Sequence, residues 1–375
     1  MLQQDKRINI NSLYMKTISK VLLGLGAMAL MACGNEPKNE NAFYTLSNGN
    51  GMQVTVTNFG GRITSVVLPD RDGKPTDVVL GFDTVEEYYP ENNKSDFGAS
   101  IGRYANRIAA AKIDIDGTQY ELSANDHGNC LHGGVSGWQY KSYKVVEADA
   151  SHIKLELVSP DGDNGFPGEV TAYVTFTLTA DNKIDIAYSA TTDAPTVVNM
   201  TNHSYFNLSG DPTRSIVDDE LYINASQFTP IDTLSIPTGT HNNVEGTPFD
   251  FRQMHRIGDN IDADCEQIAH GRGYDHNWVL DTKGDISQIA ATLYCPKNGI
   301  GLNVYTDEPG VQVYTGNFLD GTVTGKCGVA YNFRTAICLE TQHYPDSPHH
   351  TEWPSVVLRP GETYTSHCIY AFFVK

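Results

Sequence analysis

Apolar side chains recur at every second position along much of this chain, and this period most constrains how it can fold. The clearest alternating runs cover residues 52–56, 153–157, 170–178 and 184–188. A period of two places successive side chains on opposite faces of a β-strand, whereas a helix needs a period near 3.6. Helical periodicity is weak, and only residues 84–89 and 253–257 indicate a turn or two of helix. The chain is therefore predicted to be an all-β protein.

Two turn sequences connect alternating runs as hairpins. Residues 180–183 read A-D-N-K between the third and fourth runs, and Asp116-Gly117 lies between apolar positions at 113, 115, 120 and 122. An Asp-Gly pair between alternating runs is a strong hairpin signal. No Pro- or Ser-rich linker, charge run or 20–50-residue repeat divides the chain. We therefore expect residues 42–375 to form a single large antiparallel β-sandwich.

The N-terminal segment is typical of a targeting signal. Lys16 and Lys20 precede an apolar run at 21–32, which is shorter than the ~20 residues of a transmembrane helix and suits a signal peptide. The run ends in L-M-A-C at 30–33, which resembles a bacterial lipobox. The resemblance implies cleavage before Cys33 and a lipid on its sulfur; the alternative is an ordinary signal peptide with an incidental Cys.

These features predict three parts of the chain. Residues 1–32 would be an N-terminal extension and lipoprotein signal peptide, residues 33–41 a polar tether, and residues 42–375 the folded domain. The protein would then be an exported, membrane-anchored lipoprotein of a bacterial cell envelope, facing the periplasm or the cell surface. Attachment would depend on the lipid at Cys33.

Charge excludes some partners. The chain has 26 basic and 45 acidic residues, a net charge of −19. Such a surface repels nucleic acid and anionic lipid, so we expect no nucleic-acid partner. Six cysteines follow Cys33, with no C-x-x-C pair and no zinc-type spacing. We expect most of them to be buried small hydrophobes, although an exported chain could also form disulfides.

Polar and aromatic residues are mixed in five segments whose composition does not suit the core of a strand. The segments are G-R-Y-A-N-R-I at 102–108, N-C-L-H-G-G at 129–134, N-M-T-N-H-S-Y-F-N-L at 199–208, G-Y-D-H-N-W at 273–278 and C-L-E-T-Q-H-Y-P-D-S at 338–347. This mixture suits a sugar, because hydroxyls need donors and acceptors while the apolar face of the ring packs on aromatic rings. Taken singly, each segment is also compatible with ordinary turn residues.

Glu340 is the most unusual residue of these segments. It follows the apolar stretch 336–339, where burial would raise the pKa of its carboxyl; a strand-end Glu facing water is the alternative. A metal site is suggested by a nearby group of ligand-type side chains, namely His343, Asp346, His349 and His350. Prolines at 345 and 348 argue against a preformed set of three ligands, so we expect no metal.

Together the five segments resemble the aldose 1-epimerase (galactose mutarotase) family. They occur in the family's order and spacing, and P-G-V-Q-V-Y-T-G-N at 309–317 is similar as well. The resemblance covers roughly residues 43–374. It implies the galactose mutarotase-like supersandwich and an isomerase that interconverts the α and β anomers of a free hexose, D-galactose or D-glucose, without a cofactor.

The resemblance also implies roles for single residues. Glu340 would be the general base and His203 the general acid. The substrate-binding positions would be Asn106, Arg107, His132, Ser204, Tyr205, Asp275 and Gln312. His349 stands where the family often has Asn.

The chemistry of anomer exchange fits these side chains. A base must remove the proton of the C1 hydroxyl while an acid protonates the ring oxygen, and the same pair then closes the ring on the other face. We expect Asp275 to stabilise the charged form of His203. Arg107 keeps its proton and would donate hydrogen bonds to hydroxyls.

Three other functions stay open at this point. A lectin-like module would keep the pocket without turnover. A glycoside hydrolase would need two opposed carboxylates, for which Glu340 and Asp275 are the available pair. An epimerase of hexose 6-phosphates would need an Arg cluster, and only Arg103 and Arg107 are near the motifs. The preferred sugar and the oligomeric state cannot be inferred from the sequence.

Overall fold

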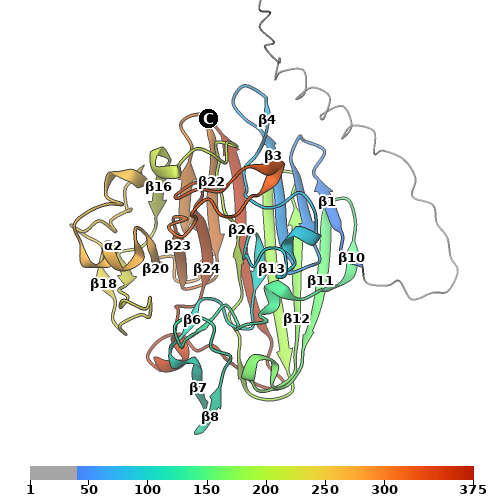
Figure 1. The fold of residues 1–375 in the computed structure, drawn as a ribbon, viewed down its shortest axis with the longest axis vertical. Coiled ribbons are helices and arrows are strands. Elements are labelled where there is room, and N and C mark those ends of the chain that lie inside the picture. The colour runs from blue at the N-terminus through green and yellow to red at the C-terminus, as the bar shows by residue number, and fades with distance from the viewer. Residues whose placement is uncertain (1–39) are drawn as a thin grey trace, which may run out of the picture. The chain divides into compact units, whose positions relative to one another are not determined.

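The regular elements of this computed structural model are mainly antiparallel strands (Figure 1), as the alternating runs predict. The largest sheet contains, in spatial order, β10 (Lys144–Ala148), β11 (His152–Ser159), β12 (Val170–Leu178), β13 (Lys183–Thr192), β26 (Tyr364–Val374), β22 (Ile300–Thr306), β21 (Ala291–Tyr294), β16 (Glu220–Ile223) and β19 (His255–Arg256). A five-stranded sheet contains β18 (Asn242–Asn243), β17 (Gln227–Thr229), β20 (Asp275–Val279), β23 (Gly310–Tyr314) and β24 (Cys338–Gln342). A four-stranded sheet contains β1 (Phe43–Ser47), β2 (Gln53–Thr57), β3 (Arg62–Pro69) and β4 (Pro75–Asp77).

Shorter elements connect these sheets. Two-stranded ribbons pair β14 (Thr196–Val197) with β25 (Val357–Leu358), β15 (Thr201–His203) with β5 (Ala99–Ile101), β6 (Arg107–Ile108) with β9 (Cys130–Leu131), and β7 (Lys112–Ile115) with β8 (Thr118–Glu121). Short 3₁₀ turns are η1 (Glu86–Tyr88), η2 (Ala109–Ala111), η3 (Trp138–Tyr140), η4 (Asp163–Gly165), η5 (Ile216–Asp218), η6 (Ile257–Asp259), η7 (Lys326–Gly328) and η8 (Ser347–His349).

Among the described residues helical structure is sparse, as the sequence predicts, but six 3₁₀ turns and one α-helix lie where no helix was expected. The turn expected at 84–89 is η1, and the one expected at 253–257 is shifted to η6. Helix α2 (Glu266–Gly271) was not predicted. A helix of six residues is too short to show a 3.6-residue period, which explains why it was missed.

The predicted alternation becomes a burial pattern in the nine-stranded sheet. Along β12 every second side chain is buried and those between are half-buried, and its partner β13 follows the same pattern. The turn at 179–182 joins these two strands, and Asp116-Gly117 joins β7 to β8. Both predicted hairpins are therefore confirmed.

One apolar core joins the three larger sheets. Val54 of β2, Phe176 of β12 and Val313 of β23 belong to the same cluster of buried side chains. Each sheet thus covers apolar surface of another, at roughly 25 cal/mol for each Å² removed from water. This arrangement is the large all-β sandwich that the sequence predicts.

The structure describes residues 40–375, and residues 41–375 form one compact unit. The signal peptide, Cys33 and nearly all of the tether lie outside the described residues, so those predictions stay untested. Among residues 40–375, no helix is both long and apolar enough to cross a bilayer. In the same part the six cysteines are free; Cys130, Cys295, Cys338 and Cys368 are buried, Cys265 is half-buried and Cys327 is exposed.

Strands β23 and β24 are buried at all five of their positions, as otherwise only the shorter strands β5, β14 and β15 are among the described residues. They nevertheless carry polar side chains, among them Gln312 and Glu340, which face each other in the strand register. Burial of an ionisable group is unfavourable unless it is paired or has a function. This pair of strands therefore marks where a site is built.

Candidate active site

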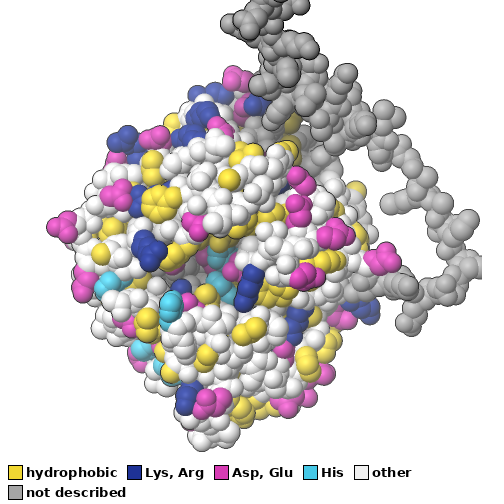
Figure 2. Space-filling view, in the orientation of Figure 1, with side chains coloured by type: hydrophobic (Ala, Val, Ile, Leu, Met, Phe, Trp, Pro, Cys, Tyr) yellow, Lys and Arg dark blue, Asp and Glu magenta, His cyan; other side chains and the backbone are white. Residues whose placement is uncertain are grey.

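A cavity of about 190 Å³ brings most of the predicted site residues together. Figure 2 shows histidine side chains inside a hollow near the middle of the visible face. The lining residues are Asp96, Asn106, Arg107, Leu131, His132, His203, Tyr205, Asp275, Tyr314, Phe318 and Glu340. Pockets for drug-sized ligands measure roughly 300–1,000 Å³. This cavity therefore suits a single small, polar molecule.

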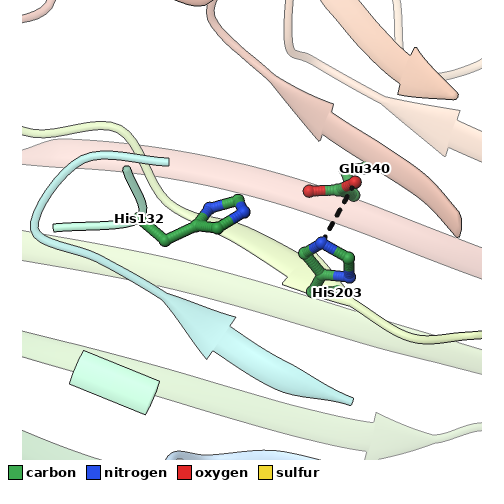
Figure 3. Close-up of side chains that lie close together, drawn as sticks. All are labelled: His132, His203 and Glu340. Atoms are coloured by element: carbon green, nitrogen blue, oxygen red, sulfur yellow. Dashed lines mark ion pairs between the residues drawn. The ribbon is translucent and has the colours of Figure 1, made fainter. Parts of the chain in front are cut away.

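Glu340 and His203 both line this cavity and point toward each other (Figure 3). Glu340 lies in the middle of β24, His203 ends β15, and the two strands pack against each other. The His203 Nε2 atom lies 3.5 Å from Glu340 Oε1. The exposed fraction is 5% for His203 and 1% for Glu340. A carboxylate and an imidazole that hardly touch water are thus held side by side.

Neighbouring strands set the charge environment of Glu340. Gln312 of β23 lies opposite it, and Gln312 Nε2 donates a 2.7 Å hydrogen bond to Asp275 Oδ1 on β20. Burial first, and then the nearby charge of Asp275, raise the pKa of the Glu340 carboxyl well above its usual value, while Arg107 lowers it. The pKa shift expected from the sequence is confirmed, and a carboxylate with a raised pKa is a stronger base.

Besides Glu340, the acid that acts on the pKa of His203 is Asp96, which corrects the expectation that Asp275 would play this part. Burial lowers the pKa of His203, and the charge of Asp96 partly offsets that effect. Asp275 instead bonds Gln312 and acts on Glu340. The sequence could not separate the two acids, because their distances from His203 depend on how β5, β15 and β20 pack.

Arg107 and His132 are positioned by two short strands. Arg107 begins β6, which pairs with β9, and His132 directly follows β9. The Arg107 Nε atom donates to Asp126 Oδ2 at 2.7 Å. Asn106 and His132 both adopt positive φ values, 62° and 49°, which are uncommon for residues other than glycine. Such strained backbone persists only where surrounding contacts fix it, and it often marks functional sites.

Three ligand-type side chains, His132, His203 and Glu340, place nitrogen or oxygen atoms within 4.8 Å of one another. The backbone N–H of Asn106 donates to His132 Nδ1 at 3.1 Å, and burial lowers the pKa of His132 to about 3. The neutral ring must then carry its hydrogen on Nε2. A metal would need a lone pair on that nitrogen, so the hydrogen bond favours His132 as a donor to a ligand.

Aromatic rings form another part of the wall. Tyr205 stacks on His203 with ring centroids 5.0 Å apart, and Tyr314 stacks on Phe318 at 6.0 Å. Phe318 keeps an exposed fraction of 50% although it lines the cavity. An exposed aromatic face beside polar groups suits the apolar C–H face of a sugar ring.

Comparisons with known proteins agree with this geometry. Residues 42–371 match the model of the family described as aldose 1-epimerase. The chain belongs to the aldose 1-epimerase family. It is 40% identical to the galactose mutarotase of Bos taurus, over 86% of this chain and 92% of that protein. It is also 40% identical to the aldose 1-epimerase of Escherichia coli K12, over 88% and 95%.

Solved structures show the same fold. A homologue of aldose epimerases from C. elegans superposes with a TM-score of 0.83 at 31% identity, covering 89% of this chain and 99% of that one. A galactose 1-epimerase from Lactobacillus acidophilus gives a TM-score of 0.78 at 29% identity, covering 92% and 98%. With the identity of the curated relatives, this makes the protein an aldose 1-epimerase enzyme.

The residues that line the cavity of this aldose 1-epimerase differ from the predicted set in two ways: some predicted residues are absent from the lining, and some lining residues were not predicted. Ser204 and Gln312 are buried but do not line the cavity; Gln312 reaches it through Asp275. Four lining residues were not predicted, namely Asp96, Leu131, Tyr314 and Phe318. Tyr314 could have been predicted, because it lies two positions after Gln312 on the same strand and therefore shares a face with it. Nothing in the sequence distinguishes the other three.

The His-rich segment after β24 does not form a common centre. His343 Nδ1 lies 2.6 Å from Glu308 Oε2, whereas His349 Nδ1 lies 2.6 Å from Asp346 Oδ1. Arg103 is also removed from the site, because its guanidinium is buried and donates to the carbonyl oxygens of residues 159, 160, 167 and 168. Arg107 is thus the single Lys or Arg among the cavity-lining residues, so a phosphate group would meet little positive charge.

Several buried polar atoms of the site have no hydrogen-bond partner within the described part of the chain. They include Asp96 Oδ1, His203 Nδ1, Gln312 Oε1 and Glu340 Oε2. Native proteins satisfy nearly all such atoms with protein, water or ligand. An aldose 1-epimerase site with several free acceptors is suited to a ligand that carries many hydroxyls.

Proposed function

We propose that this enzyme interconverts the α and β anomers of a free hexose, D-galactose or D-glucose, with Glu340 as base and His203 as acid. The observation that carries the proposal is the buried Glu340–His203 pair, 3.5 Å apart, inside a small cavity rich in unpaired polar atoms. The galactose mutarotases among its relatives support galactose as a substrate.

The reaction needs two proton transfers and no cofactor. Glu340 takes the proton of the C1 hydroxyl, the bond from C1 to the ring oxygen breaks, and His203 gives a proton to that oxygen. Rotation about the C1–C2 bond exposes the other face of the aldehyde, and reversal of both transfers closes the opposite anomer. Each positioned group contributes typically ~10²–10⁴-fold to such a rate.

The surroundings of Glu340 and His203 suit both roles. The raised pKa of Glu340 makes its ionised form a stronger base toward a hydroxyl. An ionised Glu340 3.5 Å away favours the protonated imidazole, and Asp96 acts in the same direction. Burial opposes this by lowering the pKa of His203, which makes the protonated ring a stronger acid once it is formed.

The remaining cavity residues would hold the sugar. Arg107 and the Nε2–H of His132 can donate to hydroxyl oxygens, whereas Asp275 can accept from hydroxyls. Asn106 and Tyr205 complete the polar wall, and Gln312 would act beside Asp275. Phe318 offers its exposed ring to the apolar face of the sugar.

Polarimetry of freshly dissolved α-D-galactose tests the proposal. We expect the purified protein to accelerate the approach to equilibrium over buffer, and the same assay with glucose, xylose and arabinose to rank the sugars. Binding of galactose without acceleration would favour the lectin-like alternative. Release of nitrophenol from a nitrophenyl galactoside would instead indicate a glycoside hydrolase.

We further propose that the enzyme is an exported lipoprotein, held at the envelope membrane through a lipid on Cys33. The lipobox-like L-M-A-C at 30–33, after an apolar run, supports this. In a bacterial host we expect a labelled fatty acid to be incorporated and the enzyme to fractionate with membranes. The Cys33→Ala variant should lose both properties, and unchanged labelling would contradict the proposal.

A further inference from the structure

Asp96 lines the same cavity as the two predicted acids, Asp275 and Glu340, but comes from a different part of the fold. It lies three residues before Ala99, the residue of β5 that pairs with His203 of β15. Asp275 and Glu340, in contrast, come from the five-stranded sheet. A sugar in the cavity would therefore meet carboxylates supplied by two separate parts of the fold.

The backbone on both sides of Asp96 is held by one buried guanidinium. Arg62 is fully buried, and its Nη2 and Nη1 atoms donate to the carbonyl oxygens of Ser95 and Phe97, each at 3.0 Å. Gly98 adopts a φ of +69°, and a Cβ there would lie 1.8 Å from the carbonyl oxygen of Ile63. The segment is thus fixed before a ligand arrives, which reduces the entropy lost on binding.

The carboxylate of Asp96 has an unused acceptor. Its Oδ1 atom is buried, lies in a residue that lines the cavity, and has no hydrogen-bond partner among residues 40–375. A buried acceptor without a partner is unfavourable in the free protein and becomes favourable when a ligand hydroxyl donates to it. The rigid backbone and the unpaired oxygen together describe a preformed binding position.

We propose that Asp96 is a specificity-determining residue, whose Oδ1 accepts a hydrogen bond from one particular hydroxyl of the sugar. The inference rests on the proposed function and adds the substrate contact that selects among sugars. A site built to bond a hydroxyl strongly rejects the analogue that lacks it, because the buried group is then left unpaired.

The charge of Asp96 also reaches groups on several elements, so substitutions need a pH control. The titratable and charged groups affected by it are Arg62, His132, Tyr140, His203, Tyr205, Cys338 and Glu340. Removing the charge is expected to lower the pKa values of both His203 and Glu340. Each variant is therefore compared at the optimum of its own pH profile.

The test pairs Asp96 substitutions with a series of substrates. Mutarotation of D-galactose and of its 2-, 3-, 4- and 6-deoxy analogues is measured for the parent, Asp96→Ala and Asp96→Asn. We expect the parent to discriminate against one analogue by about 10–100-fold in kcat/KM, and Asp96→Ala to lose that discrimination for the same analogue alone. Asp96→Asn keeps the shape and one acceptor oxygen, so it should fall between the two.

The outcomes separate this inference from the proposed function. An equal loss of kcat/KM for galactose and all four analogues would overturn the role of Asp96 while mutarotation stands. Calorimetric binding of the same sugars provides a readout without turnover; an analogue-specific loss there, in a protein that does not mutarotate, would keep Asp96 and overturn the proposed reaction. Absence of sugar binding by the parent would overturn both.

Glu91 provides the matched control. It is exposed on the segment that leads to Asp96, so Glu91→Gln removes one negative charge from the same segment without touching the cavity. The variant should show the discrimination of the parent. A change equal to that of Asp96→Asn would attribute the effect to overall charge and contradict a direct contact.

Discussion

Strands β12 and β24 use burial in opposite ways. β12 of the nine-stranded sheet buries Val174 and Phe176 and leaves Thr175 between them half-buried. β24 of the five-stranded sheet is buried at all five positions, yet it holds Glu340 in its centre. The first strand stabilises the sandwich, whereas the second places an ionisable group where ionisation is unfavourable.

The difference shows where a period of two carries information about function. In a strand with one face toward solvent, the polar residues lie on the exposed face and need no further explanation. A strand covered on both faces does not, so every polar side chain in it needs a partner or a ligand. Glu340 Oε2 has no such partner within the described residues, and this separates the site strand from the scaffold strand.

The largest expected effect is that of Glu340→Gln on turnover. The amide keeps the shape of the side chain but cannot take a proton, so kcat for galactose should fall by about 10³–10⁴-fold while galactose still binds. Polarimetry and calorimetry check the two halves. Glu156→Gln on β11 is the control in the scaffold sheet and should leave kcat unchanged. If the variant kept more than about a tenth of the parent's activity, Glu340 would be ruled out as the base, because loss of the base is expected to cost about 10³–10⁴-fold.

Phe176→Ala on β12 should show the reverse pattern. It removes a fully buried ring from the core, which costs about 3–5 kcal/mol of unfolding free energy, while kcat of the folded enzyme stays unchanged. Denaturant unfolding measures the loss. The neighbouring Thr175→Ala, on the half-buried face, should change stability by no more than about 0.5 kcal/mol. Equal effects of the two substitutions would contradict the alternation of burial.

His203→Asn should lower kcat by about 10²-fold with a smaller change in KM. The amide can still accept or donate a hydrogen bond but cannot deliver a proton to the ring oxygen. Steady-state kinetics over a range of galactose concentrations separates the two constants. A large rise in KM at constant kcat would make His203 a binding residue rather than the acid.

The smallest effect is on stability, and it has a sign opposite to that of Phe176→Ala. Burial and Asp275 raise the pKa of Glu340 in the folded state above its unfolded value. Between these two pKa values the unfolded chain ionises more readily than the folded one, so the free energy of unfolding falls as pH rises toward the folded pKa. Glu340→Gln should therefore raise Tm at neutral pH. The gain should disappear below about pH 4, where the carboxyl is protonated in both states. A Tm difference independent of pH would contradict this origin.

Much of the fold could be predicted because the nine-stranded sheet repeats one local rule. In β12 and β13, alternation, turn chemistry and burial agree residue by residue. Glu340, His203, Arg107 and His132 could be proposed as site residues because five short segments together resemble the aldose 1-epimerase family, and the structure places all four at one cavity. The position of α2 could not be predicted, since six residues carry too short a period.

The sequence by itself determined the strand character of this protein and two of its hairpins, because the period of two and the turn residues act over a few neighbouring positions. It also determined which motifs carry chemistry. Only the tertiary structure decided which groups each acid affects: Asp275 bonds Gln312 and raises the pKa of Glu340, whereas Asp96 raises the pKa values of both His203 and Glu340. The physical reason is that electrostatic and hydrogen-bond partners depend on distances between strands far apart in the chain, and packing of the core sets those distances.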